Sequence, residues 1–122
     1  LDMLQIPPHT EVYEIDGPYF FGIANKFDEI SQRMGTDGQK VRILRMRKVS
    51  FMDSTGIHNL EQLYMRSQRC GMTLVLSGVN ENVFKVLDKA GLVKMIGKEN
   101  IRGHINGALA RATEIVKESS TK

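Results

Sequence analysis

The sequence predicts an α/β domain: a mixed, mostly parallel β-sheet, opened by an antiparallel hairpin, with about four to five helices packed against it. Two observations carry this prediction. Strand-like segments alternate with helix-like segments along most of the chain. The strand-like segments show alternating or continuous apolar residues, and the helix-like segments show helical periodicity. A chain of 122 residues with no internal repeat suits one such domain and no more.

The two ends of the chain differ in character from its middle. Pro7 and Pro8 deny a strand its hydrogen-bond donors and hold the backbone extended, so residues 1–8 are interpreted as a tether. The last residues are polar, and residues 118–122 are predicted to be a disordered tail. The domain itself should therefore span residues 9–117.

The domain should open with two short strands and a helix. Residues 11–15 alternate polar and apolar side chains, and a Gly-Pro turn then leads into the aromatic residues 19–21. Strands joined this closely should pair antiparallel. Apolar residues at i, i+4, i+7 and i+11 then mark one stripe of a helix that ends at Gly35. They are Ile23, Phe27, Ile30 and Met34.

The next predicted strand, residues 41–49, contains a conflict. Its apolar pattern indicates burial, yet Arg45 and Arg47 fall on the same face as Val41 and Ile43. Either the far end of the strand reaches solvent, or the arginines form a basic contact surface. The pattern alone leaves both explanations open.

Three further helices and one strand follow. Residues 54–69 predict a helix that Gly71 closes, and residues 72–76 are a nearly unbroken apolar run, typical of a central strand covered on both faces. Of the last two helices, the first has Gly91 as its C-terminal cap. The residues expected to face inward, helix by helix, are Ile57, Leu60, Tyr64 and Ser67; Val83, Val86, Leu87 and Ala90; and Ile105, Ala108, Leu109, Ala112 and Val116.

Composition argues against several classes of protein. Lys and Arg total 17 against 14 Asp and Glu, and a net charge of +3 without Trp or basic runs interleaved with aromatics argues against nucleic-acid binding. Cys70 is the only cysteine, which rules out an intrachain disulfide and favours a reducing cytoplasmic setting. No stretch of the sequence approaches the ~20 apolar residues that cross a bilayer.

The functional prediction rests on the point where a strand gives way to a helix. We call the residues Met52-Asp53-Ser54-Thr55-Gly56 the corner. Asp53 or Ser54 should cap the helix, and the free amides there would suit a docked protein or an anion. Ser54 is a candidate phosphorylation site, since a phosphate would add about −1.5 to −2 charges. Met52 is expected to be an exposed, adaptable contact, and Gly56 lets backbone or a ligand approach closely.

No pattern in the chain predicts catalysis, a metal site or a cofactor. His9, His58 and His104 lack metal-ligand spacing, and a single cysteine does not complete a zinc site. Neither a Cys–His nucleophile signature nor a glycine-rich phosphate loop is present in the sequence. The chain is therefore predicted not to be an enzyme.

The corner and its surroundings resemble a known family. Phe51-Met52-Asp53-Ser54-Thr55-Gly56, preceded by an apolar strand and followed by Leu87-Asp88-Lys89-Ala90-Gly91-Leu92, resembles the STAS domain. That fold is shared by bacterial anti-sigma factor antagonists and by the cytoplasmic C-terminal domains of SulP-type anion transporters. In the antagonists a kinase phosphorylates the serine or threonine just after the aspartate of this motif, which is Ser54 here. The resemblance spans residues 8–116.

The opening of the domain resembles the transporter branch. Residues 11–24 lead from a Gly-Pro turn into an aromatic strand and a small-residue helix start, as in that branch, and residues 41–47 and 97–101 are similar to it as well. The Gly-Glu-Leu/Ile-Asp turn that is frequent in antagonists is absent. The chain thus looks like the regulatory domain of a sulfate-permease-like inorganic anion transporter.

This resemblance implies partners and a location. The chain would continue from the membrane-embedded part of its own transporter, lie at the cytoplasmic face of the inner (plasma) membrane, and modulate transport or assembly by docking cytosolic proteins. Acyl carrier protein is a partner type known in one bacterial branch, and a kinase or anti-sigma-like protein is another. Weak nucleotide or anion binding and a homodimer stay open. The main alternative is a free anti-sigma factor antagonist switched at Ser54, and the third is a small nucleotide-binding or catalytic domain.

Overall fold

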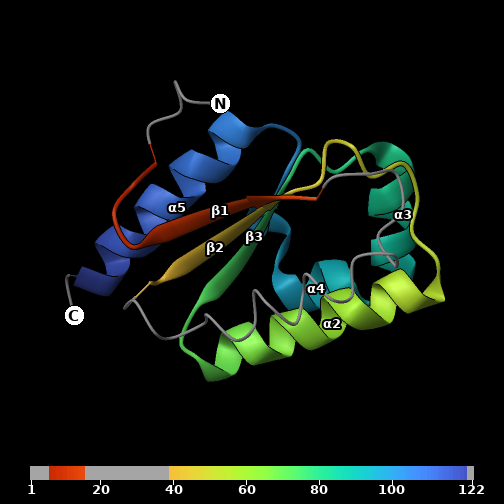
Figure 1. Ribbon diagram of the computed structural model, residues 1–122, viewed down its shortest axis with the longest axis horizontal. Helices are drawn as coiled ribbons and strands as arrows, with labels where there is room; N and C mark the ends of the chain where they lie inside the picture. Colours follow the sequence, from red (N-terminus) through yellow and green to blue (C-terminus); the bar gives the residue numbers. More distant parts are fainter. Residues whose placement is uncertain (1–5, 16–38, 121–122) are drawn as a thin grey trace.

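Parallel strands form one sheet in the part of the chain that the structure describes, residues 6–15 and 39–120 of a computed structural model (Figure 1). Their order in the sheet follows their order in the chain, and each strand pairs in parallel with the next. The strands are β1 (Thr10–Glu14), β2 (Val41–Arg45), β3 (Thr73–Ser77) and β4 (Ile101–Arg102).

Helices cover both faces of this sheet. α5 packs against β2 and β3 on one face, and α2 and α4 lie across the other (Figure 1). The helices are α2 (Ser54–Arg69), α3 (Glu81–Lys89), α4 (Leu92–Ile96) and α5 (Ile105–Ser120), with a short 3₁₀ helix η2 (Lys98–Asn100) before β4. Over the described ranges, every helix is too short or too polar to cross a bilayer.

Alternate residues of the inner strands feed two separate cores. Val41 and Ile43 of β2 and Val75 of β3 face α5, whose buried Ala108 and Ala112 are small enough to let the helix approach the sheet closely. The core on the opposite face includes Leu44, Leu60, Leu63, Leu74, Leu76, Val83 and Leu87. Because both faces are covered, β2 is buried at every position.

The predicted fold class is confirmed, since helices pack on a parallel sheet. α2 begins and ends where the sequence predicts, and β1 and β3 lie within one residue of the predicted ranges. Of the expected inward-facing residues, Ala90 is exposed, because α3 ends one residue before it. The predicted strand at residues 19–21, its antiparallel pairing and the helix expected after it lie outside the described residues.

The end of β2 corrects one prediction. The strand stops at Arg45 and not at Val49. The chain turns after Met46, whose carbonyl accepts a hydrogen bond from the Val49 amide at 3.0 Å. Val49 is buried without being part of a strand, so its apolar character extended the predicted pattern too far.

The C-terminal part of the chain corrects two more predictions. α5 continues to Ser120, into the segment 118–122 predicted to be a disordered tail. Lys and Glu are good helix formers, so the end of the apolar stripe does not end the helix. α4, η2 and β4 were not predicted, because elements of five, three and two residues are too short to show a period.

A buried ion pair lies within the sheet. Arg42 of β2 is fully buried, and its Nη2 lies 2.5 Å from Oε2 of Glu11, the neighbouring residue on β1. The guanidinium carbon also sits 5.2 Å from the ring centroid of Tyr13, within range of a cation–π contact. Burial lowers the pKa of Arg42, and the Glu11 carboxylate opposes that shift. The pair therefore lets a charged side chain occupy the core of the sheet.

The other two arginines of the predicted strand, Arg45 and Arg47, have different environments. Arg45 is only 7% exposed, so the strand itself does not reach solvent there. Arg47, past the strand end, has a half-exposed side chain that donates from Nε and Nη2 to Glu14 at 3.0 and 3.3 Å. Lys48 Nζ lies 3.6 Å from the same carboxylate. Exposure to solvent thus explains why a charged residue is tolerated at Arg47. It does not explain the buried charge at Arg45.

Replacing Glu11 by alanine is expected to lower the free energy of unfolding by about 3 kcal/mol, because it removes the carboxylate that balances the buried charge of Arg42. Urea unfolding measures this loss. Glu114→Ala is the matched control, since it breaks an ion pair with Arg111 in which the Glu114 side chain is 61% exposed, and it should cost under about 1 kcal/mol. Equal losses in the two variants would contradict a stabilising role for the buried pair.

Acidification should expose the contribution of Glu14. The hydrogen bond from Arg47 holds the pKa of Glu14 below its ordinary value of 4.5, so the contact stabilises the fold above that pH and is lost as pH falls through the lowered pKa. We expect Glu14→Gln to be less stable than the parent at neutral pH, and the difference to vanish once the pH has fallen below the lowered pKa of Glu14. Urea unfolding over a pH series tests this, and a difference independent of pH would contradict it.

Candidate functional site

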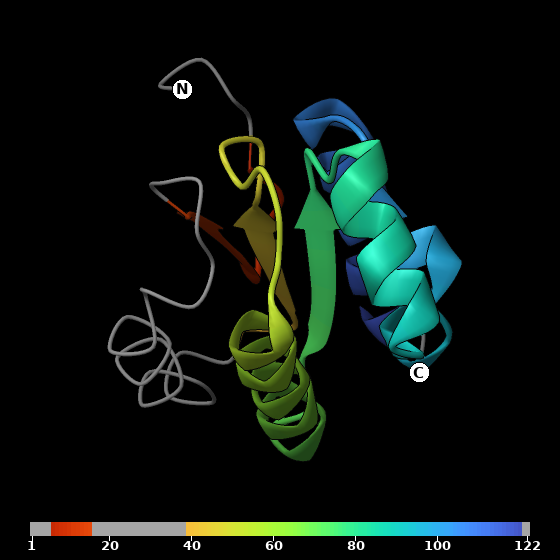
Figure 2. The same ribbon diagram turned by 90° about the vertical axis from the view of Figure 1, so that its right-hand side faces the viewer.

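The corner lies where the chain leaves the carboxyl ends of the strands and enters α2. β2 and β3 point toward one end of the molecule, and the chain beyond β2 passes from that end down to α2 (Figure 2). Asn80 anchors this loop, because its Nδ2 donates to the carbonyls of Val49 at 3.0 Å and Ser50 at 3.4 Å. Its Oδ1 also accepts from the Val83 amide at 2.8 Å, which caps α3. One side chain thus joins the corner loop to a second helix start.

Asp53 is the residue that caps α2. Its backbone is extended, with φ −100° and ψ −176°, and its Oδ1 accepts a hydrogen bond from the Gly56 amide at 2.9 Å. Ser54 is then the first residue of the helix. The sequence left Asp53 and Ser54 as alternative caps, and the geometry decides for Asp53.

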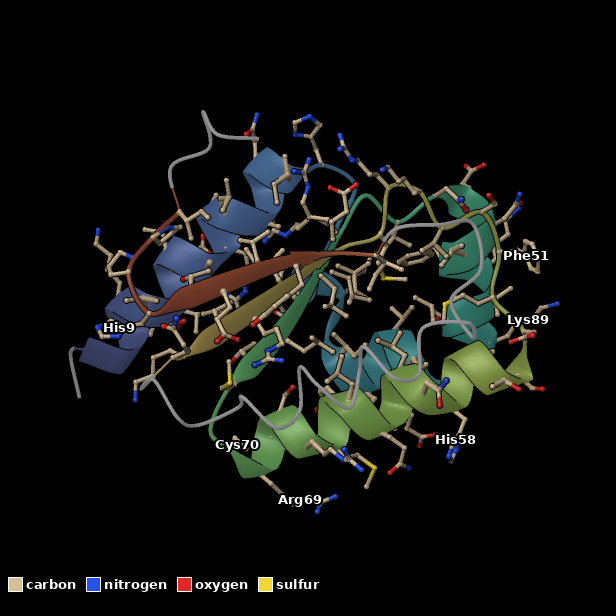
Figure 3. All side chains as sticks on the ribbon, in the orientation of Figure 1. His9, Phe51, His58, Arg69, Cys70 and Lys89 are labelled. Carbon is tan, nitrogen blue, oxygen red and sulfur yellow. The ribbon has the colours of Figure 1, made fainter. Side chains whose placement is uncertain are left out.

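Part of the corner is exposed and part is buried. Asp53, Ser54 and Thr55 are exposed, as predicted for a surface that meets a partner. Met52 is only 6% exposed and packs in the core between the sheet and α2, so the prediction that it is an exposed contact is wrong. Its unbranched apolar side chain fills core space, while the preceding Phe51 is 42% exposed and projects beside α3 (Figure 3).

The charge at the corner favours a protein contact over an anion. A helix start carries partial positive charge, and α2 has no acidic residue in its first turn. The Asp53 carboxylate nevertheless already occupies the amide of Gly56 and supplies negative charge at this point. A free anion would have to compete with that carboxylate, whereas a protein could contact the hydroxyls of Ser54 and Thr55 beside it.

The histidines and the cysteine form no second centre among the residues described. No group of three His, Cys, Asp or Glu side chains in residues 6–15 and 39–118 could hold a metal ion. His9 immediately precedes β1, and His58 projects from the outer side of α2 (Figure 3). Cys70 is exposed and free at the opposite end of α2 from the corner.

Two structurally important side chains were missed from the sequence. Asn80 stands before a helical stripe, in the position where Asn commonly caps, and that signal could have identified it. Arg42 carries no such signal, because its partner Glu11 lies on a separate strand, 31 positions away in the chain. Only the sheet register brings the two together.

Removing the cap tests how the corner is held. Asp53→Ala should lower the free energy of unfolding by about 0.5–2 kcal/mol, because the Gly56 amide loses its acceptor, while Asp53→Asn should keep most of it. Chemical denaturation with urea measures both. A loss as large in the asparagine variant as in the alanine variant would show that charge, and not capping, holds the corner.

Comparison with known proteins places this geometry in a family. A model described as "STAS domain" matches residues 3–108. The chain is 30% identical over 97 residues to a Bacillus subtilis (strain 168) protein named "Putative sulfate transporter YvdB", covering 80% of this chain and 18% of that protein. The chain spans less than a fifth of the length of the curated relatives it matches.

Solved structures agree. A sulfate transporter family protein from Wolinella succinogenes superposes with a TM-score of 0.88 and 35% identity, covering 95% of this chain and 94% of that one. The STAS domain of a SulP transporter from Vibrio cholerae gives a TM-score of 0.80 and 34% identity over 93% of this chain and 88% of that one. A "putative anti-sigma factor antagonist" from Thermotoga maritima shares the fold, at a TM-score of 0.71 and 17% identity, over 89% of this chain and 92% of that one. The chain belongs to the STAS domain family and is homologous to the STAS domains of sulfate transporters.

Proposed function

We propose that this chain is the regulatory and interaction domain of a SulP-type inorganic anion transporter, at the cytoplasmic face of the inner (plasma) membrane. The supporting observation is its similarity, at 30% identity or more over most of its length, to sulfate transporter proteins or their STAS domains. The first partner is then the membrane-embedded part of its own transporter. The domain modulates transport or assembly and carries out no reaction itself.

The docking surface in this proposal is the exposed part of the corner together with Phe51. The side chains offered are a half-exposed ring and the exposed Asp53, Ser54 and Thr55. The cap on Gly56 and the Asn80 hydrogen bonds hold this stretch in one conformation, so a partner spends little free energy on ordering it. A cytosolic protein such as acyl carrier protein, a kinase or an anti-sigma-like protein is the type of additional partner proposed.

Phosphorylation of Ser54 is the proposed switch on that surface. A phosphate on the first residue of α2 would meet the positive end of the helix and also the neighbouring Asp53 carboxylate. The two effects oppose each other, so the fold should persist while the local charge becomes strongly negative. A partner that contacts the corner would respond to that change.

The alternative function is a free anti-sigma factor antagonist switched by phosphorylation of Ser54. Its support is the exposure of Ser54 at the position that the antagonists phosphorylate, together with a shared fold. The transporter function is preferred, because three relatives that match 72–80% of this chain are named as sulfate transporters.

Sulfate uptake by the complete transporter, reconstituted in vesicles, tests the proposal. We expect Ser54→Asp to change the uptake rate by about fivefold or more relative to Ser54→Ala, the order of a typical coupling between sites. The stability of the domain should stay within about 0.5 kcal/mol, as for other surface changes. The change in rate would then arise from docking and not from unfolding.

Thr113→Asp is the matched control, since it adds the same charge at an exposed position on α5, on the far face of the sheet. It should leave uptake unchanged. Equal uptake in all three Ser54 forms, or an equal effect of Thr113→Asp, would reject the corner as a regulatory surface.

A further inference from the structure

A cavity of about 260 Å³ opens at the carboxyl ends of β2, β3 and β4. Its walls are Arg45 and Arg47 from the end of β2, Ser77 and Gly78 from the end of β3, and Gly103, His104 and Ile105 from the start of α5. Ligands in parallel α/β sheets bind at this end of the strands. The volume lies below the ~300–1,000 Å³ of pockets for drug-sized molecules, so the cavity suits a small ion or one group of a larger ligand.

Arg45 gives the cavity an unmatched positive charge. The residue is 7% exposed, and its Nη1 is buried without a hydrogen-bond partner in the part of the chain that the structure describes. Leaving a buried charged donor unpaired is costly, and proteins normally supply a partner for it. Arg42, the other buried arginine of β2, has Glu11 beside it on the opposite face of the sheet. An acceptor bound in the cavity would satisfy this donor, because Arg45 is one of the residues that line it.

The Glu14 carboxylate does not fill this role. Glu14 pairs with Arg45 in the strand register, but its oxygens accept from Nε and Nη2 of Arg47 and lie near Lys48. Arg47, Lys48 and Arg45 all lower the pKa of Glu14, so three cationic side chains of the described residues act on this one carboxylate. This gathering of cations at the strand end favours an anion.

The first turn of α5 adds donors on the other wall. This 16-residue helix has no acidic residue in its first turn, and its first amides have no acceptor within the helix. The Asn106 amide donates to Nδ1 of His104 at 3.1 Å, so the proton of a neutral His104 ring resides on Nε2, which can donate. Asp53 places a carboxylate at the start of α2, whereas an imidazole, that of His104, accepts the amide hydrogen bond at the start of α5.

Two glycines line the cavity, and they differ in the space around them. Gly78 has φ +71°, and a Cβ there would lie 2.9 Å from the backbone of Arg47, so a side chain cannot be accommodated. At Gly103, a Cβ would meet no atom within 4 Å. The space beside Gly103 is therefore free for a ligand, and a larger residue can enter it without a clash.

We propose that this cavity binds a tetrahedral oxyanion, either inorganic sulfate or phosphate or the terminal phosphate group of a larger ligand. Arg45 and the first-turn amides of α5 are its principal donors, with His104 at the rim. The site is separate from the corner and does not depend on the proposed docking function.

Titration of the 122-residue chain with sodium sulfate or sodium phosphate, against sodium chloride at equal ionic strength, tests the site. Isothermal calorimetry gives the affinity, and amide chemical shifts locate the ion. We expect sulfate and phosphate, and not chloride, to move the amide resonances of Gly103, Ile105 and Gly107. AMP is titrated in parallel: binding tighter than phosphate indicates a phosphate group of a larger ligand, and equal binding indicates the free ion.

Arg45→Met should weaken sulfate and phosphate binding by about tenfold or more, because a charge-assisted hydrogen bond is lost. Arg69→Met, which removes an exposed arginine at the far end of α2, should leave the affinity unchanged. Gly103→Leu fills space beside the cavity, keeps every charge, and should weaken binding as well.

Stability without added anion separates binding from a structural role. A methionine removes an unpaired buried charge, so Arg45→Met should unfold at the same or a higher urea concentration than the parent. Arg45→Met with unchanged affinity, or sulfate and chloride with the same effect at equal ionic strength, would overturn the proposal. A destabilised Arg45→Met variant that still binds phosphate would assign Arg45 to the fold alone.

Discussion

Strand β2 is buried along its whole length and carries an arginine on each of its two faces, and the need to accommodate these charges shapes both faces of the sheet. Arg42 lies in the interior, where only protein groups can reach it, and the fold supplies Glu11 and the Tyr13 ring from the adjacent strand. Arg45 lies at the last position of the strand, where a ligand can reach it from outside. On one face of the sheet the fold itself supplies a partner for Arg42. On the other face we propose that a ligand supplies the partner for Arg45.

A parallel sheet covered on both faces leaves its strand ends as the natural places for contact with other molecules. Two helix starts occupy this region, and they differ in charge. Asp53 immediately precedes α2, and its carboxylate accepts from the Gly56 amide. His104 immediately precedes α5, and its imidazole accepts from the Asn106 amide, in the same cavity as the buried Nη1 of Arg45. These differences support protein docking at the corner and an oxyanion at the start of α5.

Much of the fold follows from local sequence signals, and its failures have local causes. The bounds of α2 agree with the prediction because a capping Asp precedes its apolar stripe and Gly71 follows it, and Gly71 does adopt a positive φ of +75°. The end of β2 is misplaced because Val49 is apolar and buried without belonging to the strand. Met52 is misjudged because a hydrophobic residue beside an exposed motif gives no sign of the direction in which its side chain points.

The cavity is beyond prediction for a different reason. Its walls come from residues 45, 47, 77–78 and 103–105, which no periodicity connects and only the strand order brings together. The sequence does signal that something is unusual there, through two arginines on an apolar face. It does not show that Arg47 is matched by Glu14 while Arg45 Nη1 is left without a partner.

The assignment to an anion transporter is tested most directly by sequencing the reading frame upstream of Leu1. We expect about ten or more hydrophobic spans, each long enough to cross a bilayer, to be encoded there in frame with this domain. A start codon at or just before Leu1, with genes for a kinase and an anti-sigma factor alongside, would contradict the assignment and favour the antagonist.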